Sequence, residues 1–455
     1  MTDKANQIEV FYKPVLRLTM PIIIQNMLSV AVSSADVLML SRVGQSAVAA
    51  SSLASQYTQT LLMIAYGLGT GITMLSSQYW GRKDVRAINL IEGIALRFSL
   101  VISGLLTVCA LTIPQWMMRV YTNDPELIRQ GVEYLRLVSV SYICWGICEV
   151  YLSALRSVER VSISTFLNAL ALGMNVCLNA VFIFGLFGAP KLGIAGVALA
   201  TSISRFAELI GCIVVSSRSE NVKLSIRAMF VRNKVLFGDF LKLSLPAVGN
   251  DVSWGVAFSL YSAILGHLSS DMVAANSIVT VVRNFSTILC FSLASAITIW
   301  LGKKIGQNKM EEARKDASRF MLLTVITGLI GGVIILLGIP AALRFSNLEP
   351  NAMKYLKAML LINTYYVMGI AVNTSLVCGV FRSGGDSRFG LICDTIDMWG
   401  YALPVGFLAA FVLKLPHLAV YFLLCTDEFV KWPWVIGHYR SGKWLRNITK
   451  EYDGT

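Results

Sequence analysis

Long apolar blocks separated by short polar connections run through the whole chain. Twelve of these blocks reach about 20 residues, the length that an α-helix needs to cross the hydrocarbon core of a bilayer. The pattern therefore predicts an all-α polytopic membrane protein with twelve transmembrane helices. The predicted spans are residues 15–40, 48–79, 90–113, 132–155, 162–188, 192–216, 241–265, 273–301, 320–343, 355–381, 389–413 and 417–438.

One connection is much longer and more polar than the others, and it divides the spans into two groups of six. It covers residues 217–240 and is rich in Lys and Arg. We therefore predict an N-lobe over residues 1–216, a cytoplasmic connector over 217–240, a C-lobe over 241–440 and a cytoplasmic tail over 441–455.

The second half of the sequence repeats anchor residues of the first half at a shift of 225 positions. Pro21 aligns with Pro246, and Gly81 aligns with Gly306, in the same frame. An even number of spans in each repeat gives both halves the same orientation in the membrane. Such parallel repeats are typical of transporters whose substrate path lies between them. We expect two pseudo-symmetric six-helix bundles.

Composition excludes the soluble alternatives. Hydrophobic residues make up 55% of the chain and charged residues 14%, against about 25% charged residues in an average soluble domain. Mean hydropathy is +0.65. The 9 Trp, 16 Tyr and 21 Phe residues also argue against a disordered chain. The lipid bilayer is thus the first expected partner.

The net charge of +13 would suggest a nucleic-acid partner in a soluble protein. Here most Lys and Arg residues lie at the N-terminus, at the C-terminus and after even-numbered spans. The positive-inside rule therefore predicts a multi-pass protein of the plasma membrane (the bacterial inner membrane) with both termini in the cytoplasm, and we expect no nucleic-acid partner. The opposite side is expected to hold only Arg42, Arg119, Arg129, Arg136, Lys191, Arg344, Lys354, Lys357 and Lys414.

Motif searches indicate no enzyme. The nine Cys residues lie mostly in apolar blocks, without a CxxC pair or a nearby His, and we interpret them as buried small side chains. The sequence contains no GxxxxGK[ST] motif and no Ser/His/Asp constellation, so we expect neither ATP-driven transport nor hydrolysis, and no cofactor. The polar N-terminus gives no indication of a cleaved signal peptide.

Acidic residues inside the predicted spans are the first candidates for function, because an ionised group at bilayer depth is costly unless it is paired or hydrated. Arg205 can pair with Glu208, three residues away on one helix face, and Lys431 can neutralise one of its two nearby acids. The expected partner for Glu149 is Arg97 in the third span. The eight acids that we place at bilayer depth are Asp36, Glu149, Glu208, Asp251, Asp394, Asp397, Asp427 and Glu428.

Asp36 differs from the other acids because no basic residue lies within one helical turn of it. A carboxylate without a partner in a low-dielectric site tends to take up a proton or a cation. The alternative is that Asp36 lies near the outer end of its span and is hydrated. Its repeat position holds Tyr261, so the carboxylate is not needed to build the fold.

Three neutral side chains in the fifth and sixth spans could complete a cation site with Asp36. Asn175 and Asn179 lie one turn apart on one helix face, and Thr201 adds a hydroxyl. Amide and hydroxyl oxygens suit hard cations such as sodium. The alternative is that the two amides bridge neighbouring helices. The residues do not decide between sodium and proton as the coupling ion.

The second half carries its own polar set, which we predict to line a substrate cavity in the C-lobe. The spans there hold five acids against Arg283 and Lys431, a formal surplus of three negative charges that suits a cation. Two tryptophans nearby can stack an aromatic cation. The alternative is that hydroxyls and amides satisfy the acids without substrate contact. The predicted set is Asn250, Asp251, Trp254, Asp394, Asp397 and Trp399.

Several motifs, in order along nearly the whole chain, resemble those of the multidrug and toxic compound extrusion (MATE) family. The resemblance implies a V-shaped pair of bundles that exports organic, often cationic, compounds in exchange for sodium ions or protons. The substrates would be small organic molecules, and we expect a monomer. The motifs are SSADVLMLSRVGQSAVAA, SSQYWGRKD, LNAVFIFGLFGAPKLGIAGVALATSIS, SLPAVGNDVSWG, IGQNKMEEA and GVFRSGGDSRFGLICDTIDMWGYALPVG.

The resemblance also assigns roles to residues of this sequence. Asp36 matches the essential carboxylate of the first span, and Asn175 and Thr201 match residues of a cation site in the N-lobe. Asn179 stands where several members have Asp, which puts sodium affinity in doubt. Asp251 lies a few residues from an acid that some members use in the seventh span.

Two further points separate this sequence from parts of the superfamily. Some members have an Asp in the tenth span. This sequence lacks it, and Ala371 and Asn373 occupy that region. Related transporters flip lipid-linked oligosaccharides, which is the alternative function. A flippase would need a strongly basic central cavity to hold pyrophosphate, and the acid surplus of the second half argues against it.

Overall fold

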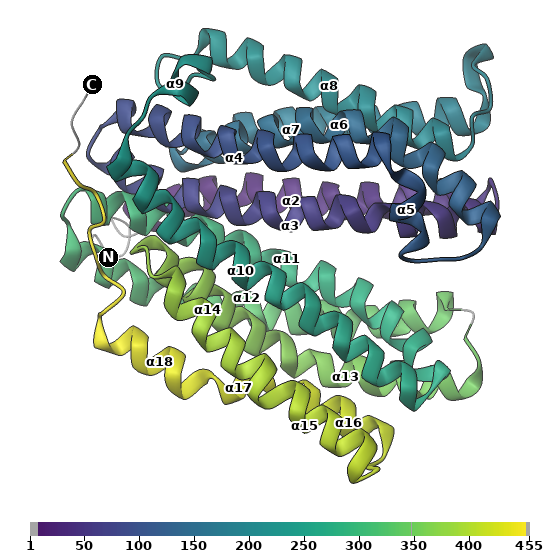
Figure 1. Cartoon of the computed structure of the whole chain (residues 1–455). Coiled ribbons are helices and arrows are strands. Elements are labelled where there is room, and N and C mark those ends of the chain that lie inside the picture. Colours follow the sequence, from purple (N-terminus) through teal and green to yellow (C-terminus); the bar gives the residue numbers. More distant parts are fainter. Residues whose placement is uncertain (1–7, 347, 452–455) are drawn as a thin grey trace. The chain divides into compact units, whose positions relative to one another are not determined.

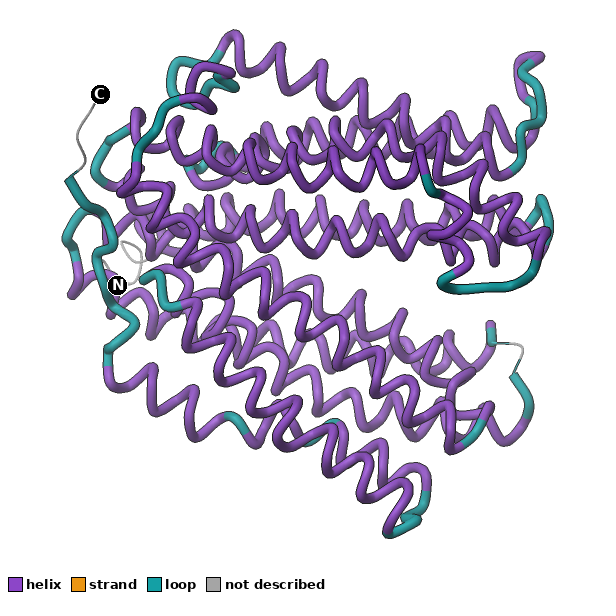
Figure 2. Tube along the Cα trace, in the orientation of Figure 1, coloured by secondary structure: helices purple, strands orange, loops and turns teal. Residues whose placement is uncertain are grey.

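The computed structural model describes residues 8–346 and 348–451. Helices form nearly all of this part of the chain, and no strand occurs within it (Figures 1 and 2). The fold is therefore all-α, as the apolar blocks predict.

Ten helical segments are long and apolar enough to cross a membrane, and each covers one predicted span. Most of them extend beyond the apolar block at one end or at both, because polar residues continue the helix, but Val161–Phe184 ends before the boundary predicted at 188. The segments are formed by α2 (Lys13–Ser41), α3 (Gln45–Gly81), α4 (Val85–Thr112), α6 (Pro125–Ser157), α7 (Val161–Phe184), α8 (Ile194–Arg218), α11 (Ser270–Gly306), α12 (Met310–Phe345), α13 with η3 (Pro350–Asn373 and Thr374–Phe381), and the run α14, η4, α15 and η5 (Ser387–Thr395, Ile396–Ala402, Leu403–Phe407 and Leu408–Val412).

The other two predicted spans are also helical. One of them is less apolar than the ten segments, and the helix of the other is broken. The span predicted at 241–265 lies within α10 (Lys234–Leu268), whose first turns carry several charged residues. The span predicted at 417–438 is divided into α16 (His417–Leu424), α17 (Asp427–Val430) and α18 (Trp432–Ser441). The breaks flank a short charged segment that contains Asp427, Glu428 and Lys431.

The repeat seen in the sequence is present in the helix boundaries. Helices α3 and α11 both contain 37 residues, and both of their ends are related by the shift of 225 positions. Helices α6 and α13 begin at equivalent prolines, Pro125 and Pro350, which suit the first turn of a helix. The turns before α4 and α12 each contain a left-handed residue, Lys83 and Asn308, at equivalent positions.

The chain forms two compact units. The N-unit contains residues 24–244 and 450–451, and the C-unit contains residues 8–23, 245–346 and 348–449 of the described chain. These units differ from the predicted lobes at two places. The first part of α2 belongs to the C-unit, and the first part of α10 belongs to the N-unit. Both helices contain a proline close to the change of unit, Pro21 and Pro246.

The physical reason for this division lies in the side chains before each proline. Phe11 and Val15 are buried in a C-unit core that includes Phe320 and Phe381. The rings of Phe11 and Phe320 meet edge to face, 5.0 Å apart. In the N-unit, the part of α10 before Pro246 stacks its aromatic rings on an aromatic ring of α4.

The connector packs against the N-terminal end of α4 within the N-unit. Asn89 donates to the carbonyl of Asn221 and accepts from the backbone N–H of Lys223. A short helix, α9 (Ile226–Phe230), lies so close to Gly93 that an added Cβ atom would meet the backbone of Ala228 at 2.6 Å. The connector and the turn after α3 are therefore at the same end of this unit (Figure 1).

Candidate functional site

The N-unit brings together all four residues predicted for the cation site. Asp36 lies on α2, Asn175 and Asn179 lie on α7, and Thr201 lies on α8. Asn179 Nδ2 donates to Asp36 Oδ1 at 2.6 Å and to Asn175 Oδ1 at 3.2 Å. Asn175 Nδ2 donates to Thr201 Oγ1 at 3.2 Å. One polar network thus joins three helices.

The network offers oxygen atoms in a largely buried place. Asn175 is 7% exposed and Asn179 is fully buried, whereas Asp36 is partly buried. Asn179 Oδ1 is buried and accepts no hydrogen bond. Carboxylate, amide and hydroxyl oxygens are ligands for hard cations. The amides also bridge helices, so the structure combines the two interpretations of the sequence.

No basic side chain forms an ion pair with Asp36 among the residues that the structure describes. The same residues contain no group of three or more His, Cys, Asp or Glu side chains that could hold a metal ion. A sodium ion at this site would therefore rest on a single carboxylate and neutral oxygens. The cation-binding role of the four residues remains a prediction.

The two other candidate acids of the N-unit are paired. Arg205 Nη1 lies 2.7 Å from Glu208 Oε2, which confirms the predicted pair. Glu149 is bound by Arg156 at 2.6 Å. The expectation that Arg97 pairs with Glu149 is wrong, because Arg97 donates to the carbonyl of Val231 in the connector.

Three of the residues predicted for the C-lobe meet around one carboxylate. Asn250 and Trp254, one turn apart on α10, donate to Asp394 Oδ2 at 3.1 and 3.2 Å. The other oxygen of Asp394 accepts from Lys431 at 3.1 Å. Asp397 joins this group through Lys431, whose Nζ lies 3.6 Å from Asp397 Oδ2.

Lys431 is the residue whose role sequence reasoning missed. It was expected to pair only within its own helix, and the bond to Glu428 at 3.2 Å confirms that part. It also reaches two acids of the preceding span, and its side chain is fully buried. The available signal was its repeat position, which holds Arg205 at a shift of 226 positions, one more than the shift that relates the first spans. We refer to Asp394, Asp397, Glu428 and Lys431 as the Lys431 cluster.

Two residues of the predicted C-lobe set lie outside the Lys431 cluster. Asp251 Oδ1 accepts from Arg382 Nη2 at 3.3 Å. Trp399 donates to Ser253 Oγ at 2.9 Å and is 41% exposed. Arg382 also corrects the charge surplus of the second half. When Arg382 is counted with Arg283 and Lys431, the five acids leave a formal surplus of two negative charges instead of three.

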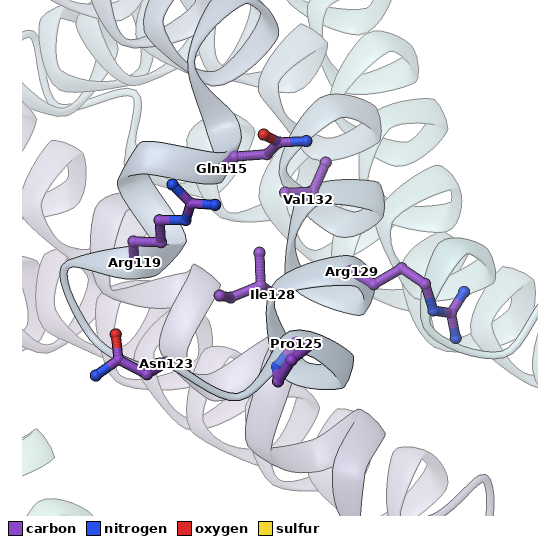
Figure 3. Close-up of a pocket in the computed structure, with 7 residues that line it drawn as sticks. All are labelled: Gln115, Arg119, Asn123, Pro125, Ile128, Arg129 and Val132. Atoms are coloured by element: carbon purple, nitrogen blue, oxygen red, sulfur yellow. The ribbon is translucent and has the colours of Figure 1, made fainter.

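The N-unit carries a surface cavity that is separate from the network of Asp36. Its volume is about 420 Å³, and it opens between α5 (Pro114–Arg119) and the start of α6 (Figure 3). None of the predicted site residues lines it. Arg129, which lines it, binds Glu126 at 2.7 Å. The lining residues are Gln115, Arg119, Asn123, Pro125, Ile128, Arg129 and Val132.

Comparison with known proteins gives consistent results over most of the chain. The family model MatE matches residues 21–181 and 252–408. The uncharacterized transporter YisQ of Bacillus subtilis is 21% identical, with 94% of each chain covered. The probable multidrug resistance protein NorM of Thermotoga maritima is 22% identical, with 96% of this chain and 95% of the relative covered.

Solved structures show the same fold. One is described as the outward-facing conformation of a multidrug resistance MATE family transporter of the MOP superfamily. It is 18% identical, covers 94% of this chain and 96% of its own, and superposes with a TM-score of 0.85. A MOP superfamily transporter from Pyrococcus furiosus has the same identity, coverage and TM-score. These likenesses support the twelve-span fold.

Proposed function

The chain belongs to the MatE family, and on that premise we propose that it is a secondary active exporter of small organic compounds. It works in the bacterial inner membrane by antiport against an inward gradient of protons or sodium ions. The two lobes alternate access to the two sides of the membrane. Relatives that are named multidrug resistance proteins support this substrate class.

The observation that carries the proposal is the network around Asp36. An antiporter needs a site that binds its cation more tightly in one conformation than in the other, because a ligand shifts an equilibrium only through such a difference. Asp36 supplies the one negative charge of the network, and α2, α7 and α8 each contribute to it. A relative movement of these helices would separate the charge from its oxygen partners.

The C-lobe contributes the side chains that meet a cationic or aromatic substrate. Of the six predicted residues, Trp254, Trp399 and Asp251 keep accessible side chains, with 41% of Trp399 and 26% of the Asp251 side chain exposed and Trp254 half-buried. Asp394 and Asp397 are each 2% exposed, so they act from inside the helix bundle. The flippase alternative is not favoured, since the curated relatives named here are transporters and multidrug resistance proteins.

Transport in proteoliposomes tests the proposal. The purified chain is reconstituted, and uptake or release of ethidium and of a neutral compound of similar size is measured. Sodium and pH gradients are imposed separately. We expect one of the two gradients to drive transport. A chain that moves neither compound under either gradient contradicts export by antiport.

Asp36→Asn tests the role of the N-unit site. The substitution keeps the size of the side chain and removes the charge that a cation neutralises, so we expect gradient-driven transport to fall to background. Glu126→Gln is the matched control, because Glu126 is an exposed acid of the same unit and its surface ion pair contributes little. Transport by Asp36→Asn at the rate of the unmodified chain would remove Asp36 from the mechanism.

A further inference from the structure

Lys431 provides too little positive charge for the carboxylates around it. Its ammonium lies 3.1 Å from Asp394, 3.2 Å from Glu428 and 3.6 Å from Asp397. Asp427, which is also fully buried, precedes Glu428 directly. Four buried acids therefore face one buried lysine. Burying charges that are not neutralised costs several kcal/mol each.

The groups around the cluster do not restore the balance. Arg382 is bound to Asp251, and Arg283 stacks over the rings of Phe258 and Tyr366 at 5.6 and 6.0 Å. If both arginines are counted, five acids still face three cations. The remaining titratable side chains that interact with these acids are neutral at physiological pH, and they are Tyr261, Tyr365, Tyr366, Cys378, Cys393 and Cys425.

The hydrogen bonds divide the acids into satisfied and unsatisfied carboxyl groups. Asp394 accepts from Asn250, Trp254 and Lys431. Asp427 accepts from the hydroxyl of Tyr261 and a backbone N–H. Asp397 accepts no hydrogen bond at either oxygen, although it is 2% exposed. Its distance of 3.6 Å to Lys431 is too long for one.

Two buried amides also face the cluster with an acceptor left over. Asn250 donates to Asp394, and Asn373 donates to Glu428 Oε2 at 2.6 Å, so both amide groups point into the cluster. Asn250 is 4% exposed and Asn373 is 2% exposed. The oxygen of each amide accepts no hydrogen bond. The site therefore has more acceptors than donors, which is the deficit that added protons remove.

We propose that the Lys431 cluster is a second, exchangeable proton site, in which Asp397 holds the proton and Lys431 is the fixed counter-ion. The proton binds to a carboxylate oxygen of Asp397 and leaves it as a hydrogen ion. A proton fits better than a metal ion, because the lysine occupies the space between the carboxylates and no metal-binding group occurs in the described residues. The inference rests on the proposed antiport, since the site would give that exchange a second coupling position.

The N-unit provides an internal comparison. At a shift of 226 positions, Arg205 is equivalent to Lys431 and Asn168 is equivalent to Asp394. There, one arginine binds one acid, Glu208, and Asn168 donates to the same acid at 3.2 Å. The position of Asp397 holds Ala171. The charge excess is thus a property of the C-unit and not of the repeat.

Infrared spectroscopy of the full chain in lipid tests the site without any substrate. A protonated carboxyl group has its own C=O stretching band, which shifts in D₂O. We expect such a band at neutral pH, reversibly lost at alkaline pH. Asp397→Asn should lose one component of this band, whereas Asp36→Asn should keep that component. A spectrum that Asp397→Asn leaves unchanged overturns the assignment of the proton to Asp397.

The lysine is tested by charge removal with a matched control. Lys431→Gln removes the counter-ion, so the carboxylates should retain more protons and the band at neutral pH should grow. Lys431→Arg keeps the charge and should keep the band. Arg205→Gln, at the equivalent N-unit position, should not change the part of the band that Asp397→Asn removes. An unchanged band in folded Lys431→Gln overturns the role of Lys431 as counter-ion. If Lys431→Gln does not fold, Lys431→Arg is the test, and a changed band in that variant overturns the same role.

The proposed antiport can fail separately from the proton site. The spectroscopic result does not depend on transport, so it stands even if the chain moves no substrate. In proteoliposomes that do transport ethidium, Asp397→Asn should lower the number of protons moved per substrate and leave sodium dependence unchanged. A band that responds to sodium instead of pH would replace the proton with sodium and overturn the proposal.

Discussion

Asn179 occupies the central position of the Asp36 network, since it contacts both Asp36 and Asn175. We predict that Asn179→Asp raises the affinity of the site for cations. The new carboxyl group would lie within hydrogen-bonding distance of Asp36, and two carboxylates so close cannot both be ionised without a proton or a metal ion between them. The dependence of transport on sodium and on pH measures the effect. An unchanged dependence in a folded variant would contradict a direct role of this network in cation binding.

Asp394 and Asp397 should differ in their contribution to stability, although both are buried. Asp394→Asn removes the charge that three donors face, and breaking a buried pair in this way costs about 3–5 kcal/mol. Asp397→Asn resembles the protonated acid and should cost much less. Thermal unfolding in detergent compares the two variants. Equal losses of stability would show that Asp397 is held as an ionised partner of Lys431.

At the scale of elements, the Lys431 cluster depends on the close approach of α13 and α17. A Cβ atom added to Gly369 would meet Cβ of Glu428 at 2.7 Å and the ring of Phe429 at 3.3 Å. We therefore predict that Gly369→Ala displaces Glu428 and destabilises the fold by about 1–3 kcal/mol, the usual cost of overpacking. Gly437→Ala is the control, because nothing lies within 4 Å of its added Cβ atom. Unfolding of both variants in detergent measures the difference, and equal stability would contradict the close packing.

The break between α16, α17 and α18 belongs to the same scale. Asp427, Glu428 and Lys431 lie in or beside the short α17, and the apolar length of the segment gave no indication of the break. Helix interruptions inside a membrane protein are tolerated where they are buried in protein. Here the interruption holds the charged side chains in the interior of the C-unit.

At the scale of the whole molecule, the orientation in the membrane is the main prediction. The basic residues place the connector in the cytoplasm. A cysteine introduced at Glu220, which is exposed, should resist an impermeant thiol reagent added to intact cells, whereas a cysteine at Phe187, which is 97% exposed, should react. Ser219 is unsuitable because it is 4% exposed. The native Cys177 is exposed and must be replaced first. The reverse labelling pattern would invert the topology.

Sequence alone determined the class of fold, the positions of the helices and the internal repeat, because these follow from local composition and periodicity. It also identified Asp36 and its three partners, since an acid without a nearby base is visible in a single span. The tertiary structure decided which charges meet. Lys431 reaches Asp394 across 37 positions, and Arg382 reaches Asp251 across 131. Such contacts depend on how helices pack, and helix packing is set by side chains from several spans at once, which no single stretch of sequence contains.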